Sequence, residues 1–107
     1  MSVAGFVQII EYQTSRIDEV VAIGKDFREQ MMAQGQDGPR PLGGTVTADR
    51  DRPGTYLSIV VFESYEAAME NSNRPEVQNF ADRMAQITQG QPKFYNLDVV
   101  DDWRLEG

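Results

Sequence analysis

Four stretches of the chain carry the apolar, β-branched and aromatic residues that are typical of strands. They cover residues 4–13, 42–49, 55–62 and 93–101. The third stretch gives the strongest strand signal, whereas the second rests mainly on Val46 and the threonines beside it. The residues Asp51-Arg52-Pro53-Gly54 predict a turn, because proline fixes one backbone dihedral angle and glycine permits the left-handed one. We therefore predict a hairpin between the second and third strands.

A helix is predicted between the first two strands. Apolar residues recur there at helical spacing from Ile17 to Met31, and Ser15 is the predicted N-cap. Gly35 suits the end of this helix. Residues 35–41 are rich in glycine and proline, so that neither a helix nor a strand is expected there.

Two shorter helical segments follow the third strand. Ser64 is placed to cap a helix over residues 65–70, which Asn71-Ser72-Asn73 interrupts. Pro75 fits the first position of a further helix. Gly90 and Pro92 are expected to end that helix before the last strand begins.

The element order is strand, helix, strand, strand, helix, strand, which is the ferredoxin-like βαββαβ arrangement of the α+β class. The 107 residues fit one domain, residues 1–107. A sheet with one face in water alternates apolar and polar residues, but the third strand is apolar on both sides. Its two sets are Tyr56, Val60 and Phe62 on one side and Leu57, Ile59 and Val61 on the other.

Two apolar sheet faces predict a partner, because the helices cover only one of them. Each large apolar side chain left in water forgoes roughly 1.5–3 kcal/mol, and a domain has only ~5–15 kcal/mol of net stability. We therefore expect a homodimer in which two sheets form a dimeric α+β barrel. The alternative is a monomer whose second face is covered by residues 35–41 and 102–107.

Composition excludes several classes of function. Acidic residues number 17 and basic residues 10, and the net charge of −7 argues against nucleic-acid binding. The chain has no cysteine and no histidine, which removes the usual metal and haem ligands and the commonest general base. We therefore expect no metal and no cofactor. No apolar stretch reaches the length of a membrane span and no signal peptide is evident, which leads us to expect no membrane association and a cytoplasmic location.

The segment Phe62-Glu63-Ser64-Tyr65-Glu66-Ala67-Ala68, followed by Arg74-Pro75-Glu76-Val77 and Phe80, resembles a known family. It is similar to the antibiotic-biosynthesis-monooxygenase-like domains of the dimeric α+β barrel superfamily. The resemblance implies a ligand cavity between the sheet and its own helices. Some members oxygenate aromatic polyketides without metal or flavin, the electrons coming from the substrate, and others degrade haem. Many members carry a histidine where this chain has Asn71, and this difference argues against haem chemistry.

Asn71 is the candidate catalytic residue, because its amide at a break between helices can donate to a developing enolate or phenolate oxygen. The alternative is that Asn71 and Asn73 cap helix ends. Arg74 is a candidate for binding a ligand carboxylate, or a surface residue. Four further residues are candidates for a small hydrophobic or aromatic ligand, or for ordinary packing: Gln8, Tyr56, Ser58 and Trp103.

Three functions remain open at this point. The first is a cofactor-independent monooxygenase-like or isomerase-like enzyme that acts on aromatic or polyketide-type compounds. The second is a non-catalytic ligand-binding or stress-associated protein of the same fold. The third is a structural dimer whose interior is filled by side chains, which a cavity of several hundred cubic ångströms would exclude.

Overall fold

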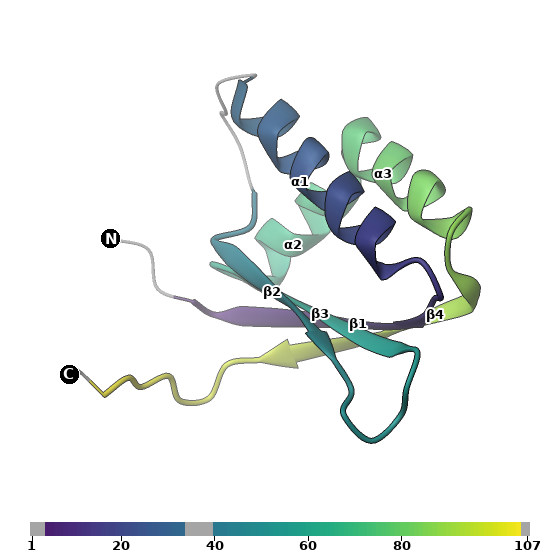
Figure 1. The fold of residues 1–107 in the computed structure, drawn as a ribbon. Coiled ribbons are helices and arrows are strands. Elements are labelled where there is room, and N and C mark those ends of the chain that lie inside the picture. Colours follow the sequence, from purple (N-terminus) through teal and green to yellow (C-terminus); the bar gives the residue numbers. More distant parts are fainter. Residues whose placement is uncertain (1–3, 34–39, 106–107) are drawn as a thin grey trace.

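The computed structural model describes residues 4–33 and 40–105 and has the predicted order of elements. Four strands form one antiparallel sheet in the order β2-β3-β1-β4, and the helices lie on one face of it (Figure 1). The strands are β1 (Phe6–Gln13), β2 (Gly43–Ala48), β3 (Thr55–Phe62) and β4 (Gln89–Asp98). The helices are α1 (Ile17–Ala33), α2 (Tyr65–Ser72) and α3 (Pro75–Ala85). The predicted ferredoxin-like α+β fold is confirmed. Among the described residues, no helix is both long enough and apolar enough to span a membrane.

Strand register divides the sheet into two faces. Phe6 pairs with Phe62 and Tyr12 pairs with Tyr56, so that the even-numbered residues of these strands share one side. The buried cluster of Phe6, Phe62 and Ala68 of α2 shows that this side is turned toward the helices. We call it the helix-side face. The opposite side is the open face, with these apolar residues: Val7, Ile9, Leu57, Ile59, Val61 and Leu97.

Helix packing is uneven over the helix-side face. α2 contributes Ala68 to the buried cluster with Phe6 and Phe62, whereas α1 and α3 meet each other through the rings of Phe27 and Phe80, whose centroids are 4.7 Å apart. The residues in the middle of the face are only half-buried: Gln8, Ile10, Ser58 and Val60. This part of the sheet is therefore accessible from the side of the helices.

The ends of two helices differ from the prediction. α1 begins at Ile17, and Thr14 rather than Ser15 accepts the Arg16 amide, at 2.9 Å. α2 is capped by Ser64 as predicted, but it continues through Asn71 to Ser72. Burial of Ala68 in the core explains this extension, because packing of an apolar helix face outweighs the low helix propensity of asparagine and serine. The predicted stop at Gly35 and most of the predicted loop lie outside the described residues.

The last strand also differs from the prediction. β4 begins at Gln89, so that Gly90 and Pro92 lie within a strand, and α3 already ends at Ala85. Proline is tolerated because β4 is an edge strand, where one side needs no backbone donor. Gly90 has a φ of 68°, and the pairing of β1 with β4 shifts register between Glu11 and Gln13. A positive φ suits glycine at such a bulge.

Candidate functional site

Polar side chains pair across the strands of the helix-side face. Gln8 Nε2 donates to Asn96 Oδ1 at 3.0 Å, from directly opposite positions on β1 and β4. The hydroxyl groups of Tyr12 and Ser58 lie 3.0 Å apart on β1 and β3. The structure therefore brings the predicted ligand residues Gln8 and Ser58 to one face, where each already has a side-chain partner. A ligand on this face would meet amide and hydroxyl groups beside the apolar Ile10.

Two tyrosine rings stack at one end of the helix-side face. The ring centroids of Tyr12 and Tyr56 are 6.2 Å apart and the ring planes are inclined by 28°. Tyr12 is buried, and burial raises the pKa of its phenol above the ordinary tyrosine value. Tyr56 is half-buried and adds aromatic surface to this face. Sequence reasoning did not select Tyr12, although its even position after Gln8 on β1 places it on the same side.

Asn71 lies in the last turn of α2, three residues after Ala68. Residues three apart share a helix side, so that the packing of Ala68 in the cluster with Phe6 and Phe62 turns Asn71 toward the sheet as well. Asn71 is 8% exposed, and within the described residues its buried Oδ1 has no hydrogen-bond partner. The C-cap position belongs to Asn73, whose backbone amide closes the helix. A buried carboxamide oxygen without a partner is costly and calls for an explanation.

Arg74 lies at the junction of α2 and α3. Its backbone amide donates to the carbonyl oxygen of Asn71 at 3.1 Å, and it occupies the N-cap position of α3. Its guanidinium lies 3.3 Å from a carboxylate oxygen of Glu76, and its side chain is only 19% exposed. The charge of Arg74 therefore already has a partner within the chain, and a role in binding a ligand carboxylate stays a prediction.

Trp103 lies apart from the other predicted ligand residues. It belongs to the segment that follows β4 and is 70% exposed. The structure therefore groups Gln8, Tyr56 and Ser58 on the helix-side face but leaves Trp103 in solvent. Its predicted place in a ligand pocket remains a prediction.

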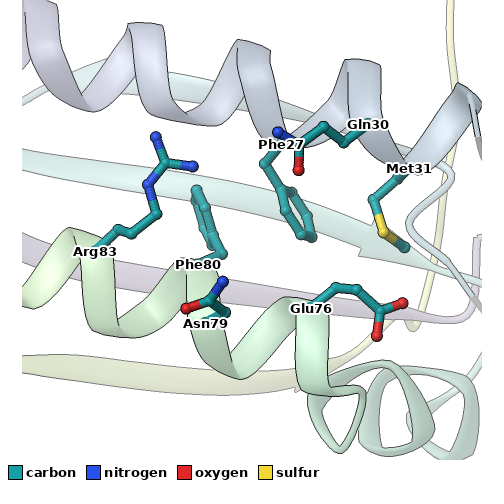
Figure 2. A pocket seen from close by; sticks show the side chains of 7 residues that line it. All are labelled: Phe27, Gln30, Met31, Glu76, Asn79, Phe80 and Arg83. Carbon is teal, nitrogen blue, oxygen red and sulfur yellow. The ribbon is translucent and has the colours of Figure 1, made fainter.

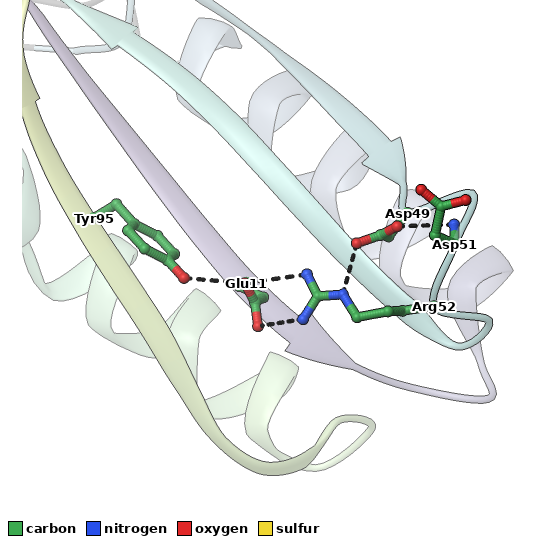
Figure 3. Close-up of polar contacts among 5 residues, drawn as sticks. All are labelled: Glu11, Asp49, Asp51, Arg52 and Tyr95. Atoms are coloured by element: carbon green, nitrogen blue, oxygen red, sulfur yellow. Dashed lines mark hydrogen bonds and ion pairs between the residues drawn. The ribbon is translucent and has the colours of Figure 1, made fainter.

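The open face carries a charged cluster that was not predicted from the sequence (Figure 3). Arg52 donates to Asp49 at 2.7 Å and to Glu11 at 3.3 Å, and the hydroxyl of Tyr95 donates to Glu11 at 3.1 Å. The hydrogen bonds from Arg52 hold the pKa of Glu11 and that of Asp49 below their ordinary values, and the Tyr95 hydroxyl lowers the pKa of Glu11 further. The sequence signal that could have predicted this cluster is Glu11, which interrupts the apolar series of odd-numbered residues on β1.

Two shallow grooves mark the surface of the described residues. One of about 70 Å³ lies between α1 and α3 and includes Phe27, Phe80 and Arg83 (Figure 2). The other, of about 250 Å³, lies at the bulged end of β1 and β4 beside Tyr12 and Lys93. Ligand sites are typically ≈300–1,000 Å³, so that neither groove is the enclosed cavity expected from the sequence. Nowhere in residues 4–33 and 40–105 do three acidic side chains gather into a candidate metal site.

Comparisons with known proteins show similarity of structure only. No family model and no curated protein matches the sequence. A crystallised asparagine-to-alanine variant of SnoaB, a cofactor-independent oxygenase from Streptomyces nogalater, has a TM-score of 0.73 at 12% identity, over 94% of this chain and 97% of that one. A Caulobacter crescentus protein provisionally named an antibiotic biosynthesis monooxygenase has a TM-score of 0.69 at 17% identity, over 94% of both chains. The resemblance seen in the sequence is therefore confirmed at the level of fold: the chain has the α+β fold of the antibiotic biosynthesis monooxygenase-like proteins.

Proposed function

We propose that this protein is a cofactor-independent monooxygenase-like enzyme that acts on a small aromatic or polyketide-type compound. The observation that carries the proposal is the buried Oδ1 of Asn71, which has no partner in the described part of the chain and lies on the sheet-facing side of α2. The fold shared with SnoaB, a cofactor-independent oxygenase, supports the same assignment. The substrate lies against the half-buried middle of the helix-side face.

The proposed role of Asn71 follows from the chemistry of its side chain. A carboxamide presents an acceptor oxygen and two N–H donors next to each other. On a phenolic substrate, Oδ1 accepts a hydrogen bond from the phenol hydroxyl. Nδ2 donates a hydrogen bond to the adjacent enolate oxygen as negative charge develops there. Tyr56 supplies a ring surface for a flat ligand, and Gln8 and Ser58 supply polar groups at its edge.

The proposed reaction needs no reductant apart from the substrate. An activated CH₂ group loses a proton to solvent, and the resulting carbanion, stabilised as an enolate, transfers one electron to O₂. Recombination forms a carbon–oxygen bond, and the resulting peroxide anion takes up a proton from solvent. The hydroperoxide so formed eliminates water to leave a carbonyl group. Overall, CH₂ and O₂ give C=O and H₂O, so that the substrate supplies all four electrons. Asn71 promotes the first step because it stabilises the enolate more than the neutral substrate.

Oxygen uptake with 1,8-dihydroxyanthrone as the probe tests this proposal. We expect the folded protein, treated with a metal chelator, to accelerate formation of the quinone with consumption of one O₂ per quinone formed. A rate equal to that in buffer, with binding of the probe verified independently, would contradict an enzymatic function on this substrate class.

We also infer that a second copy of the chain covers the open face. Three strands present apolar side chains there, and Leu97 on β4 remains 43% exposed in the single subunit. Residues 102–105 do not provide the cover that a monomer would need, since all four are exposed. When two copies pack their open faces together, each copy covers the exposed apolar residues of the other, as in symmetric dimers.

The alternative function is a non-catalytic ligand-binding protein of the same fold. The observation that favours it is that the paired polar side chains of the helix-side face, among them Gln8, Ser58 and Asn96, are amides and hydroxyls and not a poised acid or base. This alternative predicts that the anthrone probe binds without oxygen uptake, so that the same experiment separates the two functions.

A further inference from the structure

The middle of the helix-side face carries a pair of amide side chains, Gln8 and Asn96, next to apolar residues. Gln8 is half-buried on the inner strand β1, and Asn96 is exposed on the edge strand β4. The other neighbours of Gln8 on this face are Phe6 and Ile10 along β1 and Val60 across on β3. An apolar residue at position 8 would pack there without the cost of dehydrating an amide. Packing alone therefore does not explain this pair.

The hydrogen bond between the two amides leaves one polar group of each available to a ligand. Gln8 Nε2 donates to Asn96 Oδ1 at 3.0 Å, and among the described residues neither side chain has another hydrogen-bond partner. A carboxamide has one acceptor oxygen and two N–H donors. Gln8 Oε1 therefore remains available as an acceptor, and the N–H groups of Asn96 Nδ2 remain available as donors. Two carboxamides joined in this way always leave one acceptor and one donor group, whichever of them donates.

The same face of the sheet presents no positive charge. The even-numbered residues of the four strands, which form the helix-side face, include no lysine and no arginine. Lys93 lies on the open face, where its ammonium is 5.0 Å from the centre of the Tyr95 ring. Asp98 follows Asn96 on the same side of β4. A negatively charged ligand group beside Asn96 would thus lose hydration and meet a like charge, whereas a neutral polar group would not.

We propose that the Gln8–Asn96 pair determines substrate specificity by binding an uncharged carboxamide group of the ligand and disfavouring a carboxylate at the same place. The inference rests on the proposed function, which puts an aromatic ligand on the helix-side face, and it names a substituent of that ligand. The ligand amide donates to Gln8 Oε1 and accepts from Asn96 Nδ2. A carboxylate can accept from Asn96 but has no proton to donate, so that one of its oxygens faces Gln8 Oε1 as a second acceptor.

Equilibrium binding of three stable quinones tests this proposal without turnover. The probes are anthraquinone-2-carboxamide, anthraquinone-2-carboxylate and 2-acetylanthraquinone, which is neutral but has no donor. We expect the natural protein to bind the carboxamide at least about tenfold more tightly than the carboxylate. Equal affinity, or a preference for the carboxylate, overturns the proposal. Binding of none of the three overturns both this proposal and the aromatic ligand class of the proposed function. A carboxamide preference without oxygen uptake from 1,8-dihydroxyanthrone supports the pair and contradicts only the enzymatic function.

Matched variants assign the preference to the amide pair. Gln8→Met keeps the length of the side chain but removes the acceptor, and it is expected to weaken carboxamide binding at least about fivefold. Its affinity for 2-acetylanthraquinone should stay within about twofold of that of the natural protein. Gln13→Met, on the opposite side of the same strand, is the control and should leave all three affinities unchanged.

A charge substitution at the exposed end of the pair provides a second test. Asn96→Lys places a cation beside the ligand group, and we expect it to reverse the preference toward the carboxylate. Far-UV circular dichroism verifies that each variant folds. Carboxamide binding by Gln8→Met that equals that of the natural protein, or an unchanged preference in Asn96→Lys, overturns the proposal.

Discussion

Asn71 combines burial with a side-chain oxygen that has no partner in the described chain, and this combination lowers stability. Replacing such a group with an apolar side chain of similar shape removes the cost of desolvating it. We expect Asn71→Leu to raise the free energy of unfolding by about 1 kcal/mol, measured by urea denaturation. A decrease of similar size in the free energy of unfolding would show that the Asn71 amide stabilises the fold. Such a result would argue that Asn71 serves stability and not function.

Among the described glycines, Gly5 is the one that a neighbouring backbone approaches most closely. A Cβ atom at Gly5 would lie 2.3 Å from the carbonyl oxygen of Glu63, whereas a Cβ at Gly43 would meet nothing within 4 Å. We expect Gly5→Ala to lower stability by about 1–3 kcal/mol, because backbone atoms must move. Gly43→Ala is the matched control and should stay within about 0.5 kcal/mol of the natural protein. Equal melting temperatures for the two variants would contradict the close approach.

The Glu11–Arg52–Asp49 cluster connects β1 to the turn between β2 and β3. Because the folded protein lowers the pKa of both carboxyl groups, their contribution to stability is present above the unfolded pKa. It is lost as the pH falls through the lowered folded pKa. We expect the urea midpoint to fall between about pH 5 and pH 3, and Arg52→Gln to flatten that decline. Arg50→Gln is the control, and a pH profile for Arg52→Gln that matches the control would contradict the role of the cluster.

The sequence pattern predicts elements well where their signals are local. β3 has the predicted bounds, Thr55–Phe62, because its β-branched residues lie between a turn and the cap at Ser64. β4 was predicted poorly because Gly90 and Pro92 are usual helix and strand breakers. Their tolerance depends on β4 being the edge strand, which is a property of the whole sheet and not of the segment.

The candidate site was predictable only in part, for the same reason. Alternation along each strand predicts that Tyr56 and Ser58 share a face, and the register confirms it. The pairing of Gln8 with Asn96 joins residues that are 88 positions apart, and that of Arg52 with Glu11 joins residues 41 positions apart. Such contacts depend on the relative register of distant strands, which no local pattern contains.

The proposed dimer depends on the open face of the sheet. Ile59 lies at its centre, on β3 between Ile9 of β1 and Thr45 of β2. We expect Ile59→Lys to raise the dimer Kd at least about tenfold, since a buried unpaired charge costs several kcal/mol. Val46→Lys, on the opposite side of the same sheet, is the control and should leave the Kd unchanged. Sedimentation equilibrium measures both, and a dimer of unchanged Kd in Ile59→Lys would place the interface elsewhere.

Turnover by Asn71→Ala, with Asn73→Ala as its matched control, decides whether Asn71 acts in the proposed reaction. Both variants remove an asparagine amide, but only Asn71 is buried on the sheet-facing side of α2. With 1,8-dihydroxyanthrone we expect Asn71→Ala to lose about 10²–10³-fold in kcat, the usual effect of removing one donor to an oxyanion, while the probe still binds. Asn73→Ala should turn over like the natural protein. Equal turnover by Asn71→Ala and the natural protein would contradict a catalytic role for Asn71.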